Sequence, residues 1–509
     1  MKTRKSSVLA FLSFSVAGVA LLCTAPLLAQ EHHHHGDGEL GTVNFPVSCA
    51  PEVRVDFSHA VALLHSFGYE QARNAFTAIA RKDPSCAMAQ WGVAMTWYHP
   101  IWAPPTASDL DSGRAAAEKA ATLPAESERE KGFVDAIGKF YRGGVERDFR
   151  SRTAAYRDAM TALAGRFPDD HEVVIFEALS ILGAAVPGDP TFTAQKQAAG
   201  ILTSLLDAEP NHPGIAHYMI HAYDYPPLAS LALPAARRYA QIAPASPHAL
   251  HMPTHIFTRL GLWKESIDGN LASSAAAQRI VAVAHPGTTS FDDLHAMDYL
   301  EYAYLQLGDD AKAHEVLDRA AKVSAIDAPE LAAAYSLCAI PARYAVERRQ
   351  WADAAKLEMP KANLPWDRFA YAGESIYLAR AIGSARTGNA SGAKEAVARL
   401  EALRDALRKS PVPGPYDWAS HLEATRLSAA AWLARVEGRD ADAVELARAG
   451  ADLDDKIGKH AVSPGGIVPA RELLGDLLLD LNRPAEALPE YEASLRNSPN
   501  RLNALAGAS

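Results

Sequence analysis

The feature that most constrains the fold is a recurring pair of amphipathic segments. The pair is clearest in residues 471–499, RELLGDLLLDLNRPAEALPEYEASLRNSP, where two runs of apolar residues spaced three and four apart flank a break at residues 481–484. This spacing predicts two helices, each with one apolar face. Because neither helix buries that face alone, the unit requires similar units stacked against it.

The same arrangement recurs along the chain. Near the front, residues 68–84, GYEQARNAFTAIARKDP, carry large and small residues in the same phase as the second helix of that unit. Counting all copies predicts about nine or ten helical pairs. No sustained strand alternation follows residue 29, so the predicted fold class is all-α, a superhelical solenoid. Weaker copies surround Gly261, Gly308, Trp351, Gly388 and Gly438.

The pattern within each pair resembles the tetratricopeptide repeat (TPR) family. That repeat is about 34 residues long and places large, small, aromatic and proline residues at fixed positions. The resemblance implies a right-handed superhelix, in which positions two, five, nine, twelve and thirteen of each first helix line a concave groove. The matching residues are Leu474, Gly475, Leu478, Ala487, Tyr491 and Pro499, and near the front Tyr69, Ala72, Phe76, Pro84 and Ala87.

Four longer segments give a closer resemblance. They look like segments of a family of exported bacterial TPR proteins that has no established function. The likeness covers most of the chain and supports the fold, but it implies no reaction, substrate or partner. The segments are CAMAQWGVAMTWYHPIW (86–102), AHYMIHAYDYP (216–226), PHALHMPTHIFTRLGLW (247–263) and PARELLGDLLLDLNRPAEAL (469–488).

The N-terminal residues predict export. Three basic residues among the first five precede an apolar run over residues 8–28, and Ala29 is a small residue before a cleavage site. We therefore expect a signal peptide over residues 1–29 and a periplasmic or secreted mature chain. An uncleaved anchor and lipidation at Cys23 are the alternatives. No second apolar run of membrane-spanning length follows, so we expect no membrane span in the mature chain.

The net charge argues against one class of partner. The formal charge of −10 becomes −10 − 3 = −13 when the three basic residues of the leader are removed. Binding to phosphate backbones requires a basic surface, so no nucleic-acid partner is expected. A peptide or protein partner is the expectation for a TPR-type groove.

Three cysteines remain after the leader: Cys49, Cys86 and Cys338. An oxidising compartment permits a disulfide between Cys49 and Cys86 and would leave Cys338 free. The alternative is three unpaired thiols that are mostly buried. The sequence leaves both alternatives open.

The spacing of the central histidines follows the repeat. His217 and His251 are 34 residues apart, and so are His221 and His255. They fall at positions five and nine of two successive first helices, so equivalent residues stack side by side. Within each helix the two histidines are four residues apart and share one face. Four imidazoles placed in this way can share a zinc or copper ion, and we predict them as metal ligands.

Further polar residues are expected to border the same groove. A third repeat beginning near Leu294 would put a histidine, an aspartate and a tyrosine at positions two, five and nine. Two further histidines, 34 residues apart, lie near position thirteen of the first two repeats. The predicted groove residues are His248, His295, Asp298, Tyr302, Asp224, Arg259, His65 and His99.

Three functions fit these residues. The preferred hypothesis is a binding or scaffold protein whose groove holds a divalent transition metal. The second is metal-independent capture of a peptide or protein segment, in which the histidines only donate and accept hydrogen bonds. The third is a metal-dependent, hydrolase-like enzyme with Asp298 or Asp224 as base. Because the chain has no GxSxG motif, phosphate-binding glycine loop or catalytic cysteine setting, we assign no catalytic residue.

The predicted organisation is a leader followed by one array of repeats. The segment after the leader has no helical periodicity and carries four consecutive histidines, so we expect it to be flexible. The predicted parts are the signal peptide (1–29), the flexible segment (30–46) and N-terminal (47–210), central (211–328) and C-terminal (329–509) repeats.

Overall fold

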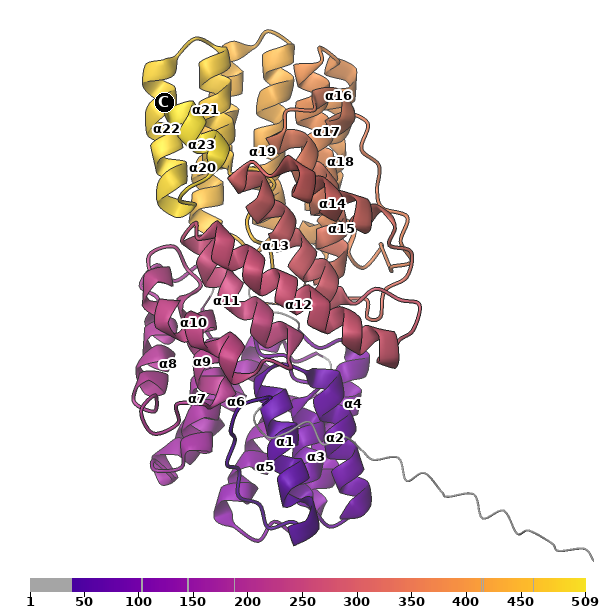
Figure 1. Ribbon diagram of the computed structural model, residues 1–509, viewed down its shortest axis with the longest axis vertical. Coiled ribbons are helices and arrows are strands. Elements are labelled where there is room, and N and C mark those ends of the chain that lie inside the picture. Colours follow the sequence, from indigo (N-terminus) through magenta and orange to yellow (C-terminus); the bar gives the residue numbers. More distant parts are fainter. Residues whose placement is uncertain are drawn as a thin grey trace, which may run out of the picture. The chain divides into compact units, whose positions relative to one another are not determined.

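The computed structural model of the chain is helical throughout the part that it describes (Figure 1). This part contains 23 α-helices and three short 3-10 helices, and it has no β-structure beyond two isolated bridges. The all-α prediction is confirmed. The predicted leader, Cys23 and the run of four histidines lie outside the described residues. These residues are 39–101, 104–143, 146–186, 188–412, 414, 416–460 and 462–509.

Most helices follow one another after short connections, and the longest connection lies between α16 and α17. The first twelve are α1 (Arg54–His65), α2 (Tyr69–Lys82), α3 (Ala87–Met95), α4 (Ala107–Thr122), α5 (Glu128–Tyr141), α6 (Phe149–Arg166), α7 (His171–Gly183), α8 (Thr193–Thr203), α9 (Pro213–Tyr223), α10 (Leu233–Ile242), α11 (Pro247–Arg259) and α12 (Trp263–Ala284). The others are α13 (Phe291–Leu307), α14 (Asp310–Ala321), α15 (Leu331–Glu347), α16 (Trp351–Ala354), α17 (Glu374–Arg386), α18 (Ala390–Lys409), α19 (Trp418–Val436), α20 (Asp440–Ile457), α21 (Ala470–Asp480), α22 (Pro484–Asn497) and α23 (Leu502–Ala508). The 3-10 helices are η1 (Pro51–Val53), η2 (Ala229–Ala232) and η3 (Ala370–Gly373).

Consecutive helices pack as hairpins, α1 with α2 through α21 with α22, and α23 follows as a single helix. The described chain therefore contains eleven hairpins, whereas the sequence pattern predicted about nine or ten. The two hairpins that the sequence pattern did not predict are α5–α6 and α7–α8, because no copy of the repeat pattern was found in their residues.

Small residues lie where consecutive helices approach closely, both within hairpins and between them. A Cβ atom on Gly475 of α21 would lie 2.8 Å from the ring of Tyr491 in α22. A Cβ atom on Gly92 of α3 would collide with the ring of Phe76 in α2. The pattern read from the sequence therefore corresponds to direct helix-to-helix contacts, as a TPR-type solenoid requires.

The segment before α1 packs inside the first four hairpins. The ring of Phe45 lies 5.4 Å from Phe57 of α1, 5.4 Å from Trp91 of α3, 5.2 Å from Phe133 of α5 and 6.4 Å from Phe176 of α7, between centroids. Phe45 is only 2% exposed. Residues 39–46 therefore differ from the predicted flexible segment, because an aromatic side chain buried among first helices anchors them.

Segments near the C-terminus contact the central helices α12 and α13. The hydroxyl group of Tyr299 in α13 donates to the carbonyl oxygen of Ser463 at 3.1 Å. Arg501, which precedes α23, donates to the hydroxyl group of Tyr302 at 2.9 Å. The indole nitrogen of Trp263 donates to the carbonyl oxygen of Asn500 at 2.9 Å. Repeats that are far apart in sequence therefore meet at the central helices.

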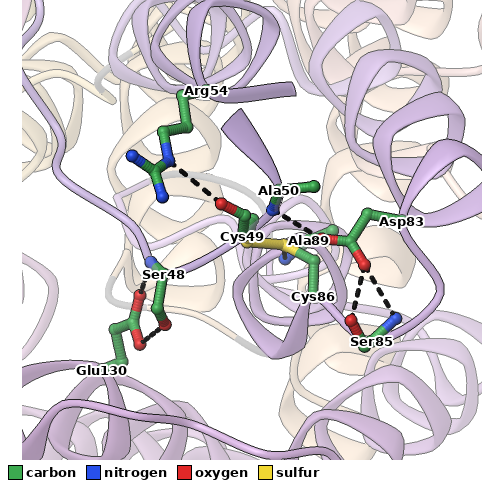
Figure 2. The surroundings of a disulfide bond; sticks show 9 residues. All are labelled: Ser48, Cys49, Ala50, Arg54, Asp83, Ser85, Cys86, Ala89 and Glu130. Carbon is green, nitrogen blue, oxygen red and sulfur yellow. Dashed lines mark hydrogen bonds between the residues drawn. A yellow bond between two sulfur atoms is a disulfide. The ribbon is translucent and has the colours of Figure 1, made fainter. Parts of the chain in front are cut away.

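A disulfide joins Cys49 to Cys86, with 4.9 Å between their Cα atoms (Figure 2). It ties the segment before α1 to the start of α3. Next to it, a carboxylate oxygen of Asp83 accepts from the backbone N–H of Ala50 at 2.8 Å. Cys338 is a free, buried thiol in α15. The pairing that the sequence left open is therefore the one present in the structure.

Among the described residues, no helix combines the length and the apolar character that crossing a bilayer requires. The described residues from 39 to 509 form one compact unit. The predicted boundaries at 210/211 and 328/329 both fall in connections, between α8 and α9 and between α14 and α15. The three predicted groups of repeats are therefore consecutive parts of one array.

Candidate metal centre

Six histidines from three consecutive first helices form two groups. Within each group, one ring nitrogen of every histidine lies within 4.8 Å of the others. The four predicted ligands do not form a single group. The two on α9 are joined by a histidine of α11, and the two predicted on α11 are joined by one of α13. The first triad is His217, His221 and His248, and the second triad is His251, His255 and His295.

The first triad converges on the Nε2 atom of His217. This atom lies 3.0 Å from Nε2 of His248 and 3.1 Å from Nε2 of His221. On its other side, Nδ1 of His217 lies 2.6 Å from the carbonyl oxygen of His65. Because a carbonyl oxygen only accepts hydrogen bonds, Nδ1 carries the proton of the neutral ring and Nε2 presents a lone pair. His217 is therefore oriented as a metal ligand.

The second triad has two rings whose tautomers are set by their outer partners. Nδ1 of His251 lies 2.7 Å from Oδ1 of Asn270, and the amide nitrogen of Asn270 donates to the carbonyl oxygen of Ser266. Nδ1 of His255 lies 3.1 Å from Oδ2 of Asp224. Both partners accept, so both histidines are protonated at Nδ1. Metal-binding histidines commonly donate their second nitrogen to a carbonyl or carboxylate oxygen in this way.

These two tautomers bring two lone pairs face to face. Nε2 of His251 and Nε2 of His255 are 2.9 Å apart, and neither carries a proton when both rings are neutral. Two acceptors at this distance repel each other unless a cation lies between or beside them. Nδ1 of His295 is also buried without a hydrogen-bond partner, and an unpaired buried nitrogen costs free energy. The second triad therefore has two opposed lone pairs and one unpartnered nitrogen.

Burial lowers the pKa of all six imidazoles below the usual histidine value. The pKa of His217 falls to about 3, chiefly because burial disfavours the charged ring. The same cause comes first for the other five. At neutral pH the six rings are therefore neutral, which is the state in which imidazole binds a metal.

Asp224 anchors the second triad from outside. Its carboxylate accepts from Nε of Arg259 at 2.8 Å and from Nζ of Lys459 at 3.2 Å, in addition to His255. Although burial acts in the opposite direction, these cations hold the pKa of Asp224 well below its usual range. Asp224 is therefore a carboxylate that orients His255. Arg259, a predicted groove residue, forms an ion pair with Asp224.

The third repeat begins earlier than the sequence predicted. Helix α13 starts at Phe291 rather than near Leu294, so His295 takes position five and Tyr299 takes position nine. The hydroxyl group of Tyr299 lies 3.3 Å from Nε2 of His255. Sequence reasoning missed Tyr299, although its four-residue spacing from His295 repeats that of the histidine pairs. The long helix α12 obscured the register between the two repeats.

Two residues predicted for the groove have other partners. The carboxylate of Asp298 accepts from the guanidinium group of Arg343 at 2.6 Å, and both side chains are fully buried. The hydroxyl group of Tyr302 accepts from Arg501. Both side chains therefore join α13 to other helices or to the C-terminal end, and neither belongs to a triad.

The two N-terminal histidines of the predicted groove, His65 and His99, lie in different environments. Nδ1 of His65 lies 2.8 Å from the hydroxyl group of Tyr218, and its Nε2 lies 3.0 Å from Glu172. The other oxygen of Glu172 lies 3.0 Å from Nε2 of His212. His65 therefore supports the first triad through its carbonyl group. His99 lies apart, with its ring 4.2 Å from that of Tyr69.

Two important partners carried no local sequence signal. Asn270 lies on α12, and Lys459 lies just after α20, in a connection about 200 residues from the triads. Neither belongs to a motif that marks a metal site. Only the packing of these segments against α9 and α11 brings them to the histidines.

No protein-family model matches the chain, and no curated protein matches it. Among solved structures, the chain is similar to the Cut9–Hcn1 hetero-tetramer of the APC/C, at 12% identity over 93% of this chain and 78% of that chain, with a TM-score of 0.36. It is also similar to the human IFIT1 dimer with m7Gppp-AAAA, at 12% identity over 81% and 90%, with a TM-score of 0.38. A third structure, the TPR domain of P58(IPK), gives 12% identity over 90% and 96%, with a TM-score of 0.21. The TPR-type fold of this chain rests on its own hairpins and their small and aromatic residues.

Proposed function

We propose that this chain is an exported TPR-type solenoid that binds a divalent transition metal, zinc or copper, at the second triad. The observation that carries the proposal is the 2.9 Å approach of two deprotonated Nε2 atoms, on His251 and His255. The Nδ1–H group of His251 donates to Asn270, and that of His255 donates to Asp224. A cation removes the repulsion between the two lone pairs. Imidazole ligands favour zinc, copper, iron or nickel over magnesium or calcium.

The experiment measures metal in the purified mature chain. To prevent binding by the tail, the background carries His32→Ser, His33→Ser, His34→Ser and His35→Ser. Elemental analysis should find at least one equivalent of zinc or copper per chain, and the double variant His251→Ala, His255→Ala should lose the second-triad ion. The matched control is His285→Ala, His314→Ala, because these side chains are 36% and 56% exposed. A chain that takes up no ion, and whose Tm a chelator leaves unchanged, would contradict the proposal.

Export is part of the same proposal. The N-terminal basic and apolar residues support a leader that ends near Ala29. The pairing of Cys49 with Cys86 suits an oxidising compartment, because such bonds are rare where thiols are kept reduced. Cell fractionation with N-terminal sequencing of the exported chain tests it. A chain retained in the cytoplasm with both thiols reduced would contradict it.

Capture of a peptide or protein segment is the second candidate function. It is supported by the helical-repeat architecture, since extended peptides commonly bind to such grooves. The chain's own segments already fill two stretches of the first-helix surface, around Phe45 and around Ser463. A partner would therefore bind elsewhere or displace one of them. Metal-independent capture that persists in the double variant His251→Ala, His255→Ala would favour this function.

A hydrolase-like activity would require one further element. Three histidine ligands leave a coordination position open, at which a zinc-bound water can be activated. Asp298 is paired with Arg343 and Asp224 with Lys459 and Arg259, so neither carboxylate is free to act as the base. The chemistry of the residues therefore favours binding over turnover.

A further inference from the structure

We propose that the centre is binuclear, with one ion in each triad and both triads sharing helix α11 as a common wall. This inference rests on the proposed metal binding at the second triad and adds a second ion at the first. Each triad supplies three ring nitrogens within 4.8 Å of one another. Three imidazoles are sufficient to hold one zinc or copper ion, with a fourth position left for water or a small anion.

The arrangement on α11 explains why two sites lie together. His248 belongs to the first triad and His251 to the second, and they are three residues apart on this helix. Side chains at this spacing are neighbours on one face, with about 5–6 Å between their Cβ atoms. A four-coordinate ion accepts no more than four of the six nitrogens. Two ions, rather than one, therefore satisfy all six imidazoles.

Both triads have a ligand prepared by an outer partner. In the first triad, the carbonyl oxygen of His65 sets the tautomer of His217. In the second triad, Asn270 and Asp224 do so for His251 and His255. A ring held in this way presents its remaining lone pair to a metal before the metal arrives. A purely structural cluster of histidines does not require these lone pairs to converge.

The two groups lie close enough for their charges to interact. His248 of the first triad and His251 of the second are neighbouring side chains on α11. Two cations at these positions therefore repel each other, and a small bridging anion such as hydroxide would offset the repulsion. Each ion would have one coordination position open for such an anion.

The two triads differ in accessibility. The first triad has two half-buried ligands, His221 and His248, whereas the second has one, His295. The other two ligands of the second triad, His251 and His255, are 2% and 4% exposed. Because a chelator must reach the ligands, the first-triad ion should leave faster than the second-triad ion. The second-triad ion would stabilise the fold, and the first-triad ion would exchange with solution.

The test counts ions in the chain whose tail histidines are replaced by serine. The unmodified triads should hold two equivalents of zinc after equilibration with zinc chloride and removal of the excess. His248→Ala and His295→Ala should each reduce the content to one equivalent, and together they should reduce it to none. His314→Ala, an exposed histidine on α14, is the matched control and should retain two. Release to a chelator should have two phases, and His248→Ala should lack the faster one.

The outcomes separate the two proposals. One equivalent that only His295→Ala removes would overturn the second ion and leave the proposed function standing. If the parent holds one equivalent of zinc, and both His248→Ala and His295→Ala remove it, the two triads share a single ion. This result would also overturn the binuclear centre. No bound ion would overturn both proposals. If a variant fails to fold, anomalous scattering at the zinc edge from crystals of the zinc-loaded parent distinguishes two peaks from one.

Discussion

Asn270 is a single side chain on which the orientation of His251 depends. Its amide oxygen accepts from Nδ1 of His251, and its amide nitrogen is held by the carbonyl oxygen of Ser266. Removing such an outer partner typically lowers metal affinity about 10- to 100-fold. We expect Asn270→Ala to weaken zinc binding by this factor in a competition titration with a chelator. Asn497→Ala, which changes an exposed residue of α22, should leave the affinity unchanged, and equal affinities in both variants would count against the assigned role.

Arg501 is a buried cation that two carboxylates hold. Its guanidinium group contacts Glu347 and Glu472, and all three side chains are at most 1% exposed. In Arg501→Met, the two carboxylates would stay buried without a cationic partner, which costs about 3–5 kcal/mol. Denaturant unfolding of the metal-free chain measures this loss. Arg483→Met removes an exposed ion pair with Glu486 and should change the unfolding free energy little. Similar losses in both variants would contradict this account.

At the scale of elements, the packing of consecutive helices depends on close approach at particular glycines. Gly92 of α3 lies against the ring of Phe76 in α2, so a methyl group there has no space. Overpacking of this kind typically costs about 1–3 kcal/mol, and we expect Gly92→Ala to destabilise the chain by that amount. At Gly200 of α8, an added Cβ meets nothing within 4 Å. Gly200→Ala should therefore stabilise the chain by about 0.4–1 kcal/mol, because alanine restricts the unfolded state. Thermal unfolding of the two variants should shift Tm in opposite directions.

The elements were predictable because their signals are local. Gly475 and Tyr491 pack together across one hairpin, as their sequence positions predicted. The start of α13 was less predictable, because the 22-residue helix α12 takes up the insertion between repeats. Because α13 begins three residues earlier than predicted, Tyr299 lies beside the histidines in place of Asp298 and Tyr302. Register across an insertion depends on how the inserted residues fold, which periodicity does not report.

At the scale of the whole molecule, stability should depend on pH through the connection after α20. His460 in this connection is 8% exposed, and burial lowers its pKa to about 3. The folded state therefore binds its proton less readily than the unfolded state does. The stability that the neutral ring contributes is complete above the unfolded value of about 6.5 and is lost as the pH falls from there.

Between pH 7 and pH 5, we expect the free energy of unfolding of the metal-free parent to fall by about 1–2 kcal/mol more than that of His460→Gln. Denaturant unfolding at both pH values, with a chelator present, measures the difference. His314→Gln replaces an exposed histidine and should follow the parent at both values. Parallel curves for the parent and His460→Gln would contradict a buried neutral ring at this position.

The sequence by itself determined most of the helical pairs and the histidine pairs on α9 and α11, because each depends on residues three, four or 34 positions apart. Only the tertiary structure decided how these pairs are divided between two triads. It also decided that Phe45 fills the surface of the first hairpins and that Lys459 reaches Asp224. Such contacts join segments that are far apart in the chain, and their geometry follows from the accumulated rotation of many stacked hairpins. No local pattern encodes that rotation, which is why the composition of the site emerged only from the folded chain.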